Sequence, residues 1–215
     1  MMTPNTKPQT PTVPKSSAAA TGTTRARPNR VRADVATWQG RFGPFTAVVR
    51  DGVVLASGWT SDVDWLVALV AAADRPSELR ERRTLGDVSR AVDAYDAGAI
   101  TAIDAIPVHQ HTGAFHHEVR EQLRAIPPGA PLSYAELAAA AGRPRAARAA
   151  GTACARNPTS LFVPCHRAVG SNGSLHGFGW GLALKAALLD HECVHATLGS
   201  DTPGEVPGGL RRLPL

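Results

Sequence analysis

Apolar positions in the first part of the chain follow strand spacing first and helical spacing afterwards. Phe45–Arg50 and Val53–Ser57 are apolar and β-branched, and the Asp51-Gly52 pair between them suits a type I′ turn, so they predict a β-hairpin. Apolar residues at helical spacing predict a helix in residues 62–73 and another in residues 85–97. We therefore expect a small N-terminal α/β domain over residues 33–108, with helices packed on an antiparallel sheet.

The second half of the chain has the pattern of helices. Phe115–Ile126 is amphipathic, and the capping box Ser133-x-x-Glu136 starts a helix at Tyr134–Ala141. A tight turn containing glycine and proline leads to a third helix, Arg145–Ala155. Two short helices joined in this way are typical of a helix-turn-helix.

A short apolar run and a final helix complete this mainly helical domain, which we expect to cover residues 109–198. Leu161–Val163 predicts a short buried strand that runs into Cys165. Leu182–Cys193 predicts a helix whose buried stripe includes Leu182, Ala186 and Leu189. The fold class expected for the whole chain is α+β.

Charge divides the chain into stretches of different sign. Residues 1–32 hold six basic residues and no acidic one, with too few apolar groups to offset the entropy of ordering, so they predict a disordered basic tail. Residues 33–136 hold nine basic and 14 acidic residues, whereas residues 137–189 hold six basic residues and no acidic one. A polyanion is attracted to this last stretch. An Ala/Arg-rich composition inherited from a GC-rich genome gives the same pattern, so charge alone leaves nucleic-acid binding open.

The remaining composition sets limits on the class of protein. A hydrophobic fraction of 43% suffices for a core, and no apolar run reaches the length of about 18 residues that a transmembrane helix needs. The three cysteines cannot all pair within one chain, which favours a reducing compartment, the cytoplasm, over a disulfide scaffold. Residues 199–215 are expected to form a flexible C-terminal tail.

Cys165 is the candidate nucleophile. A free thiol with a pKa of about 8.5 is only a few per cent thiolate at pH 7, and the adjacent His166 and Arg167 offer a base and a positive charge that increase this fraction. Downstream, Phe178 and Trp180 alternate with glycines and offer flat faces for stacking a base. The plainer interpretation is an inert buried cysteine beside a surface histidine and arginine.

The run from Phe115 to Glu192 resembles the active-site domain of the methylated-DNA–protein-cysteine S-methyltransferases, the 6-O-alkylguanine-DNA alkyltransferases. The resemblance is carried by Pro-Cys-His-Arg, with Asn157-Pro158 before it and Glu192 after it, and extends weakly back through Gly43-Pro44 and Ala94-Tyr95. It implies a winged-helix-like DNA-binding domain that flips an alkylated guanine out of double-stranded DNA. The alkyl group then passes irreversibly to Cys165, once per molecule, from 6-O-methylguanine as the main expected substrate and 4-O-methylthymine as a second candidate. No metal or organic cofactor, no membrane and no obligate protein partner are implied, and the protein is expected to be a monomer.

The same resemblance assigns roles to individual residues. Cys165 matches the alkyl acceptor, and His166 matches the histidine that takes the thiol proton through a water. Glu192 matches the carboxylate that holds this histidine in its useful tautomer. Asn157 matches a residue that ties the active-site turn together, and Tyr134 matches the tyrosine that helps neutralise the departing guanine.

Further residues are expected to contact DNA or the extruded base. Arg148 matches the arginine that fills the gap left by the flipped base, from a helix docked in the minor groove. The expected DNA contacts are Arg148, Arg145, Ala149, Gly151, Arg156 and Arg167. The expected substrate pocket is formed by Tyr134, Cys154, Ala168, Phe178, Gly179 and Trp180. The bulk of Trp180 is expected to narrow this pocket and disfavour benzyl-sized adducts.

Three rival functions deserve comparison. A catalytically silent lesion-binding protein of the same fold would lack the cysteine that is present at position 165. A transcriptional regulator would need an upstream zinc-cysteine cluster or a second helix-turn-helix, and neither is evident. A cysteine hydrolase would need a nucleophile and base that meet through space, which adjacent Cys165 and His166 do not readily imitate. Histidines 109, 111, 116 and 117 are read as scattered surface residues rather than as metal ligands.

Overall fold

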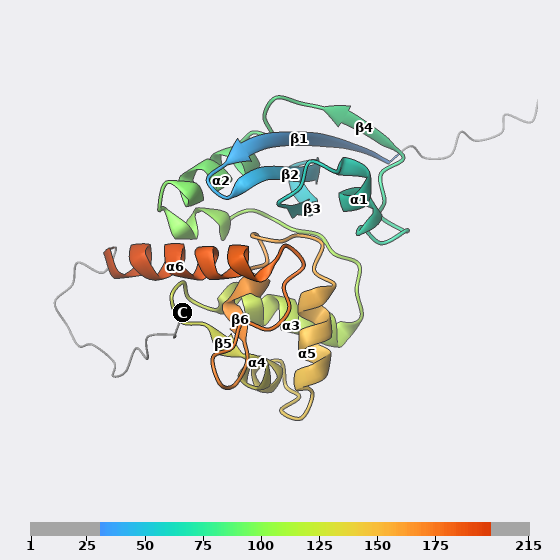
Figure 1. The fold of residues 1–215 in the computed structure, drawn as a ribbon. Coiled ribbons are helices and arrows are strands. Elements are labelled where there is room, and N and C mark those ends of the chain that lie inside the picture. The colour runs from blue at the N-terminus through green and yellow to red at the C-terminus, as the bar shows by residue number, and fades with distance from the viewer. Residues whose placement is uncertain (1–30, 199–215) are drawn as a thin grey trace, which may run out of the picture.

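A four-stranded sheet forms the first half of the protein in the computed structural model, which describes residues 31–198 (Figure 1). Its strand order is β3-β2-β1-β4, with the first three strands antiparallel and β4 added parallel to β1. The strands are β1 (Arg32–Gly40), β2 (Gly43–Arg50), β3 (Val53–Gly58) and β4 (Glu78–Glu81). The sheet is mainly antiparallel, as expected, although β4 makes it mixed.

The predicted hairpin is confirmed. β2 and β3 pair antiparallel across the turn, and both turn residues have positive φ, 52° at Asp51 and 80° at Gly52, as a type I′ turn requires. The predicted tails, 1–32 and 199–215, lie outside the described residues, except that Val31 is described and Arg32 already begins β1.

The two faces of the sheet are covered by different helices. α1 (Val63–Ala68) packs Leu66 against one face, and α2 (Asp87–Asp96), followed by the 3₁₀ turn η1 (Ile100–Ile103), covers the other. α1 is shorter than the predicted helix over residues 62–73. It begins after Asp62, whose side chain caps the amide of Trp65, and the guanidinium of Arg75 accounts for its early end by binding the carbonyls of Ala68 and Val70.

The second half is mainly helical and lies below the sheet in Figure 1. Its helices are α3 (Ala114–Ala125), α4 (Tyr134–Ala140), α5 (Ala147–Ala155) and α6 (Leu182–Leu198). Two short strands, β5 (Leu132–Ser133) and β6 (Ala168–Val169), pair in parallel beside them. The predicted capping box of Ser133 and Glu136 is present at the start of α4. Among the described residues, no helix is long and apolar enough to cross a membrane.

Two sequence-based expectations about this half are wrong. Residues 161–163 form no strand, because Leu161 has a φ of 78° and the chain turns sharply there, pairing Ser160 with Val163. Cys165 instead begins a 3₁₀ turn, η2 (Cys165–Arg167). Leu182 is not part of a buried stripe, since it is 48% exposed. α6 instead runs along the boundary between the two halves (Figure 1), and its buried side chains include Lys185, Leu188, Leu189, His191 and Glu192.

Candidate active site

Cys165 lies at the end of a loop, residues 157–165, that is attached to both halves of the protein. The amide of Asn157 donates to the carbonyl of Val163 at 2.8 Å and to Sγ of Cys165 at 3.2 Å. The other side of this loop is bound by Ser57 at the edge of the sheet. The carbonyl of Ser57 accepts from the amide of Ser160 at 3.1 Å, and its amide donates to the carbonyl of Pro158 at 2.8 Å. The prediction that Asn157 ties this turn together thus agrees with the geometry, although the role itself stays a prediction.

Gln110 supports Asn157 from the segment between the two halves, and no sequence motif pointed to this residue. Its amide nitrogen donates to Oδ1 of Asn157 at 2.9 Å and also binds the hydroxyl of Thr159. Because Oδ1 is occupied in this way, the amide nitrogen of Asn157 is directed toward the sulfur.

The charge state of Cys165 depends on opposing influences. The side chain is 6% exposed, and burial raises the pKa of its thiol, whereas hydrogen bonds with Asn157 and Ser160 and the charge of Lys185 lower it. Burial prevails in the free protein, so the thiol is mainly protonated there. Removal of this proton is therefore a necessary part of any reaction in which the sulfur acts as a nucleophile.

Lys185 brings a buried positive charge to the site. Its ammonium group donates to the carbonyls of Ala168 and Leu175 at 2.6 and 2.5 Å and lies 5.7 Å from the centre of the Tyr134 ring. Burial lowers the pKa of Lys185, and the neighbouring Cys165 counteracts that effect. The same interaction favours the thiolate of Cys165, because attraction between opposite charges stabilises both charged forms.

His166 is completely buried and points one ring nitrogen at Glu192. Nε2 lies 2.9 Å from Oε1 of Glu192, and Nδ1 is buried without a hydrogen-bond partner. A neutral imidazole whose Nε2–H is held by a carboxylate has Nδ1 as its acceptor. The pair therefore has the arrangement of a base and the group that orients it.

Glu192 is the centre of a buried hydrogen-bond network, of which the sequence predicted only the contact with His166. It accepts two hydrogen bonds from the guanidinium of Arg167, both 2.8 Å long, and one of 3.0 Å from the hydroxyl of Tyr95. Burial would raise the pKa of this carboxyl, but His166 and Arg167 hold it down to about 2. Tyr95 comes from α2 in the first half, and no sequence pattern linked it to Glu192.

The expectation that Arg167 contacts DNA is wrong. Its side chain is buried, and besides Glu192 it binds the carbonyl of Ile126 at 2.6 Å. A guanidinium that is buried and held by these partners cannot reach a phosphate outside the protein. Arg167 acts instead as the structural counter-charge of Glu192.

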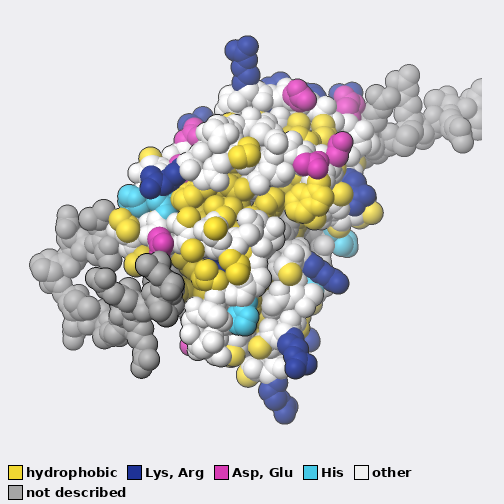
Figure 2. All heavy atoms as spheres, in the orientation of Figure 1, with side chains coloured by type: hydrophobic (Ala, Val, Ile, Leu, Met, Phe, Trp, Pro, Cys, Tyr) yellow, Lys and Arg dark blue, Asp and Glu magenta, His cyan; other side chains and the backbone are white. Residues whose placement is uncertain are grey.

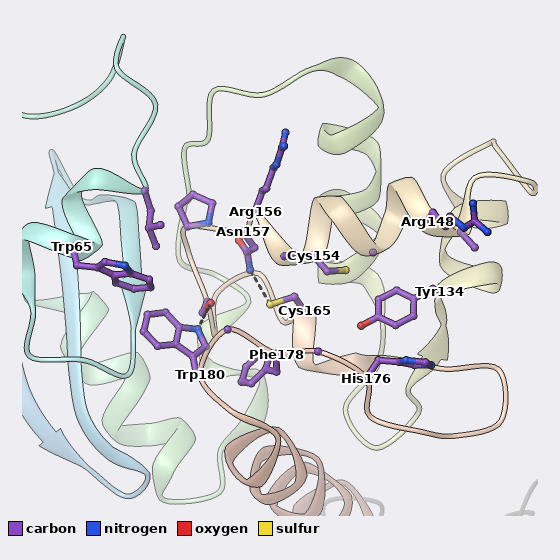
Figure 3. A pocket seen from close by; sticks show the side chains of 18 residues that line it. Trp65, Tyr134, Arg148, Cys154, Arg156, Asn157, Cys165, His176, Phe178 and Trp180 are labelled. Carbon is purple, nitrogen blue, oxygen red and sulfur yellow. Dashed lines mark hydrogen bonds between the residues drawn. The ribbon is translucent and has the colours of Figure 1, made fainter.

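A cavity of about 810 Å³ opens beside Cys165 (Figure 3). Of the expected pocket residues, Tyr134, Cys154, Phe178, Gly179 and Trp180 line it. Ala168 does not, because it is fully buried in β6 and offers its carbonyl to Lys185. The structure adds His176, whose ring is 6.0 Å from that of Tyr134, and also Trp65 and Leu69 of the first half.

Tyr134 forms the wall of the cavity opposite Trp180 (Figure 3). Burial raises the pKa of its phenol to about 12, as do the neighbouring thiols of Cys154 and Cys165. The hydroxyl therefore keeps its proton at neutral pH and can donate a hydrogen bond to a group in the cavity.

Positive charge gathers along α5 at the mouth of the cavity. Arg148 and Arg156 are exposed and line it, together with Gly151, and Arg145 is exposed just before the helix. Ala149 lies on the same helix and is half-buried. Lys and Arg side chains follow this edge of the helical half in Figure 2. Within residues 31–198, no group of three or more His, Cys, Asp or Glu side chains is arranged to hold a metal ion.

Comparison with known proteins identifies the second half of the chain. Residues 114–194 match a family model described as 6-O-methylguanine DNA methyltransferase, DNA binding domain. The methylated-DNA–protein-cysteine methyltransferase of Salmonella typhimurium is 45% identical over 107 residues, which cover 50% of this chain and 63% of that protein. The protein of the same name from Mycobacterium leprae is 41% identical over 124 residues, covering 58% of this chain and 74% of that protein.

The fold agrees with solved structures. Mycobacterium tuberculosis OGT in complex with DNA superposes with a TM-score of 0.65 at 28% identity, covering 75% of this chain and 94% of that one. The likeness includes both halves, since such coverage extends well beyond residues 114–194. The α+β fold expected from the sequence is thereby confirmed.

Proposed function

Since the chain belongs to the family of methylated-DNA–protein-cysteine methyltransferases, we propose that it repairs alkylated guanine in DNA by transferring the alkyl group to its own Cys165. The observation that carries this proposal is the position of Cys165, whose sulfur is bound by Asn157 and borders a cavity large enough for a purine. The chain spans 63% of the length of the Salmonella relative, so its activity, substrate and partners are part of this proposal.

The reaction begins with removal of the thiol proton. His166, oriented by Glu192, has Nδ1 available as acceptor, and Lys185 and Asn157 stabilise the thiolate that results. Burial disfavours that thiolate in the free protein, so the proton is best removed when the substrate alkyl group is already beside the sulfur.

In the transfer step a sulfur–carbon bond forms while the carbon–oxygen bond to the guanine breaks. The electron pair of the broken bond goes to the purine, which is neutralised by a proton, and the phenol of Tyr134 is the donor that the cavity offers for this charge. The product is a thioether, which has no carbonyl for water to attack, so each molecule acts once.

Double-stranded DNA is the proposed partner. α5 presents small residues, Ala149 and Gly151, for close approach to the DNA backbone, and Arg145 and Arg156 for its phosphates. Arg148, at the rim of the cavity, is placed to fill the space that a flipped base leaves in the stack. We further propose that the protein acts as a monomer in the cytoplasm, where Cys154 and Cys165 stay reduced.

Intact mass spectrometry tests this function. After incubation with a duplex that contains one 6-O-methylguanine, we expect the protein to gain a single methyl group, and Cys165→Ser to gain none. Tight binding without a mass gain would favour a silent lesion-binding protein, and turnover of an ester would favour a hydrolase. Either outcome would reject the proposal.

A further inference from the structure

The cavity beside Cys165 continues past the acceptor sulfur into the first half of the protein. Trp65, within α1, and Leu69, directly after its last residue, line this cavity and are 46% and 39% exposed. Figure 2 shows hydrophobic side chains gathered in a band between the two halves on this face. This end of the cavity therefore offers an apolar surface to a group that enters it.

Trp180 lines this region from the side of the sheet. Its ring packs directly on Gly58 of β3, so closely that a Cβ at this position would collide with the ring. The indole Nε1 donates a hydrogen bond of 2.8 Å to the hydroxyl of Ser160. The rings of Trp65 and Trp180 meet edge to face at 5.3 Å between centroids. The two tryptophans thus form one wall of the cavity. The expectation that Trp180 disfavours benzyl-sized adducts stays a prediction, which the rate measurements below test.

The direction of this wall suits the geometry of the transfer. Trp65 and Trp180 lie on one side of Cys165, while Tyr134, His176 and Arg148 lie on the other (Figure 3). In an in-line displacement the sulfur, the reacting carbon and the leaving oxygen are collinear. Any further carbon atoms of the alkyl group must then project sideways. If the purine sits toward Tyr134 and Arg148, these atoms project toward the tryptophans.

We propose that Trp65, with Leu69 and Trp180, forms a subsite for apolar alkyl groups longer than methyl, so that the N-terminal half selects the alkyl group that is transferred. This inference rests on the proposed function and names a substrate class for it. The occupant is the distal part of the substituent on the guanine oxygen, preferably an aromatic one, because the edge of a tryptophan ring attracts another ring. A methyl group is too short to reach Trp65 and gains nothing from it.

Single-turnover rates with matched substrates test the subsite. The same duplex is prepared with 6-O-methyl-, 6-O-butyl- or 6-O-(4-phenylbutyl)guanine, and each variant is compared with the unaltered protein on the same substrate. When a substitution removes the apolar contacts that a side chain makes with a few carbon atoms of the substrate, the transition state is less stable and the rate falls by about ten-fold. We expect Trp65→Ala to slow transfer of 4-phenylbutyl by about this factor and that of methyl by less than about two-fold, with Trp65→Phe restoring most of the loss.

Two further variants separate the subsite from a general structural effect. Gly58→Ala forces Trp180 away from the sheet and toward the cavity, so it should also slow 4-phenylbutyl more than methyl transfer. Leu182→Ala, a change at an exposed leucine outside the cavity, should alter no rate. Equal slowing of all substrates in Trp65→Ala, or no transfer of 4-phenylbutyl by a protein that transfers methyl, would overturn the subsite. Failure to transfer even methyl would instead overturn the proposed function.

Discussion

The hydroxyl of Tyr95 in α2 donates a 3.0 Å hydrogen bond to Oε1 of Glu192 in α6, across the boundary between the halves of the protein. The same oxygen is bound by Nε2 of His166 and Nη2 of Arg167. Because the tyrosine is fully buried, its hydroxyl has no water to replace this partner. The position of the carboxylate that holds His166 is thus set in part by a residue of the N-terminal half.

Tyr95→Phe should therefore weaken both stability and chemistry. A buried hydrogen bond to a charged group contributes about 2 kcal/mol, and we expect the free energy of unfolding in urea to fall by about that amount. The rate of methyl transfer should fall as well, since one of the donors that fix Oε1 is lost. Thr37→Val, which removes an exposed hydroxyl from a pair with Thr46, is the control and should change stability by less than about 0.5 kcal/mol. Equal stability of Tyr95→Phe and the unaltered protein would contradict this account.

Asn157→Asp should suppress the reactivity of the thiol. The substitution places a carboxylate where an amide now donates to Sγ of Cys165, which raises the pKa of the thiol further. We expect alkylation of Cys165 by iodoacetamide at pH 8 to slow at least about ten-fold, and its pH profile to move upward. Asn172→Asp, in an exposed turn, makes the same chemical change away from the sulfur and should leave the rate unaltered. A profile that does not move would mean that the amide does not influence the sulfur.

The Glu192 network should make the protein sensitive to acid. The pKa of Glu192 is lowered from 4.5 to about 2 in the folded protein, so its stabilising contribution is complete above pH 4.5 and is lost as the pH falls toward 2. A shift of this size corresponds to about 3 kcal/mol. Denaturant titrations at pH 6, 4 and 3 should show more than half of this loss by pH 3 in the unaltered protein and none of it in Glu192→Gln. The difference between the two proteins is the relevant quantity, because Asp96 and Asp104, whose pKa burial raises, act in the opposite direction. Parallel curves would refute the assignment.

Arg148→Ala should impair repair of duplex DNA more than reaction with the free base. Extruding a base costs a few kcal/mol, and a side chain that fills the gap recovers part of it. We expect single-turnover repair of a methylated duplex to slow about ten-fold or more, while reaction with free 6-O-methylguanine changes less than about two-fold. Arg145→Ala removes a similar charge outside the cavity, so it should weaken duplex binding without changing the ratio of the two rates. Equal slowing on both substrates would exclude the role in base flipping.

The predicted parts of the fold depend on interactions between residues that are close in the sequence. Asp51-Gly52 and the capping box of Ser133 and Glu136 act within a few residues, and both are found where the pattern placed them. The motif around Cys165 likewise placed His166, Glu192 and Asn157 together, because the resemblance supplied their tertiary arrangement.

The features that escaped prediction depend on contacts between distant residues. Arg167 and the arginines of α5 look alike in sequence, and only the position of Glu192, 25 residues away, determines that Arg167 is buried. Tyr95 and Glu192 are separated by 97 residues, so no periodicity links them. Trp65 and Leu69 fit a plain amphipathic helix in the sequence, and their contact with the cavity exists only because the two halves meet there.

The hydrogen bonds between Ser57 and the loop of residues 157–165 have a consequence for self-association. β3 is an outer strand of the sheet, and an uncovered outer strand is a template on which a second molecule can add its own strand. Here the segment that leads to Cys165 also occupies part of that template, through Pro158 and Ser160. The loop of residues 157–165 therefore shields this part of the sheet from intermolecular pairing for as long as it stays bound to Ser57.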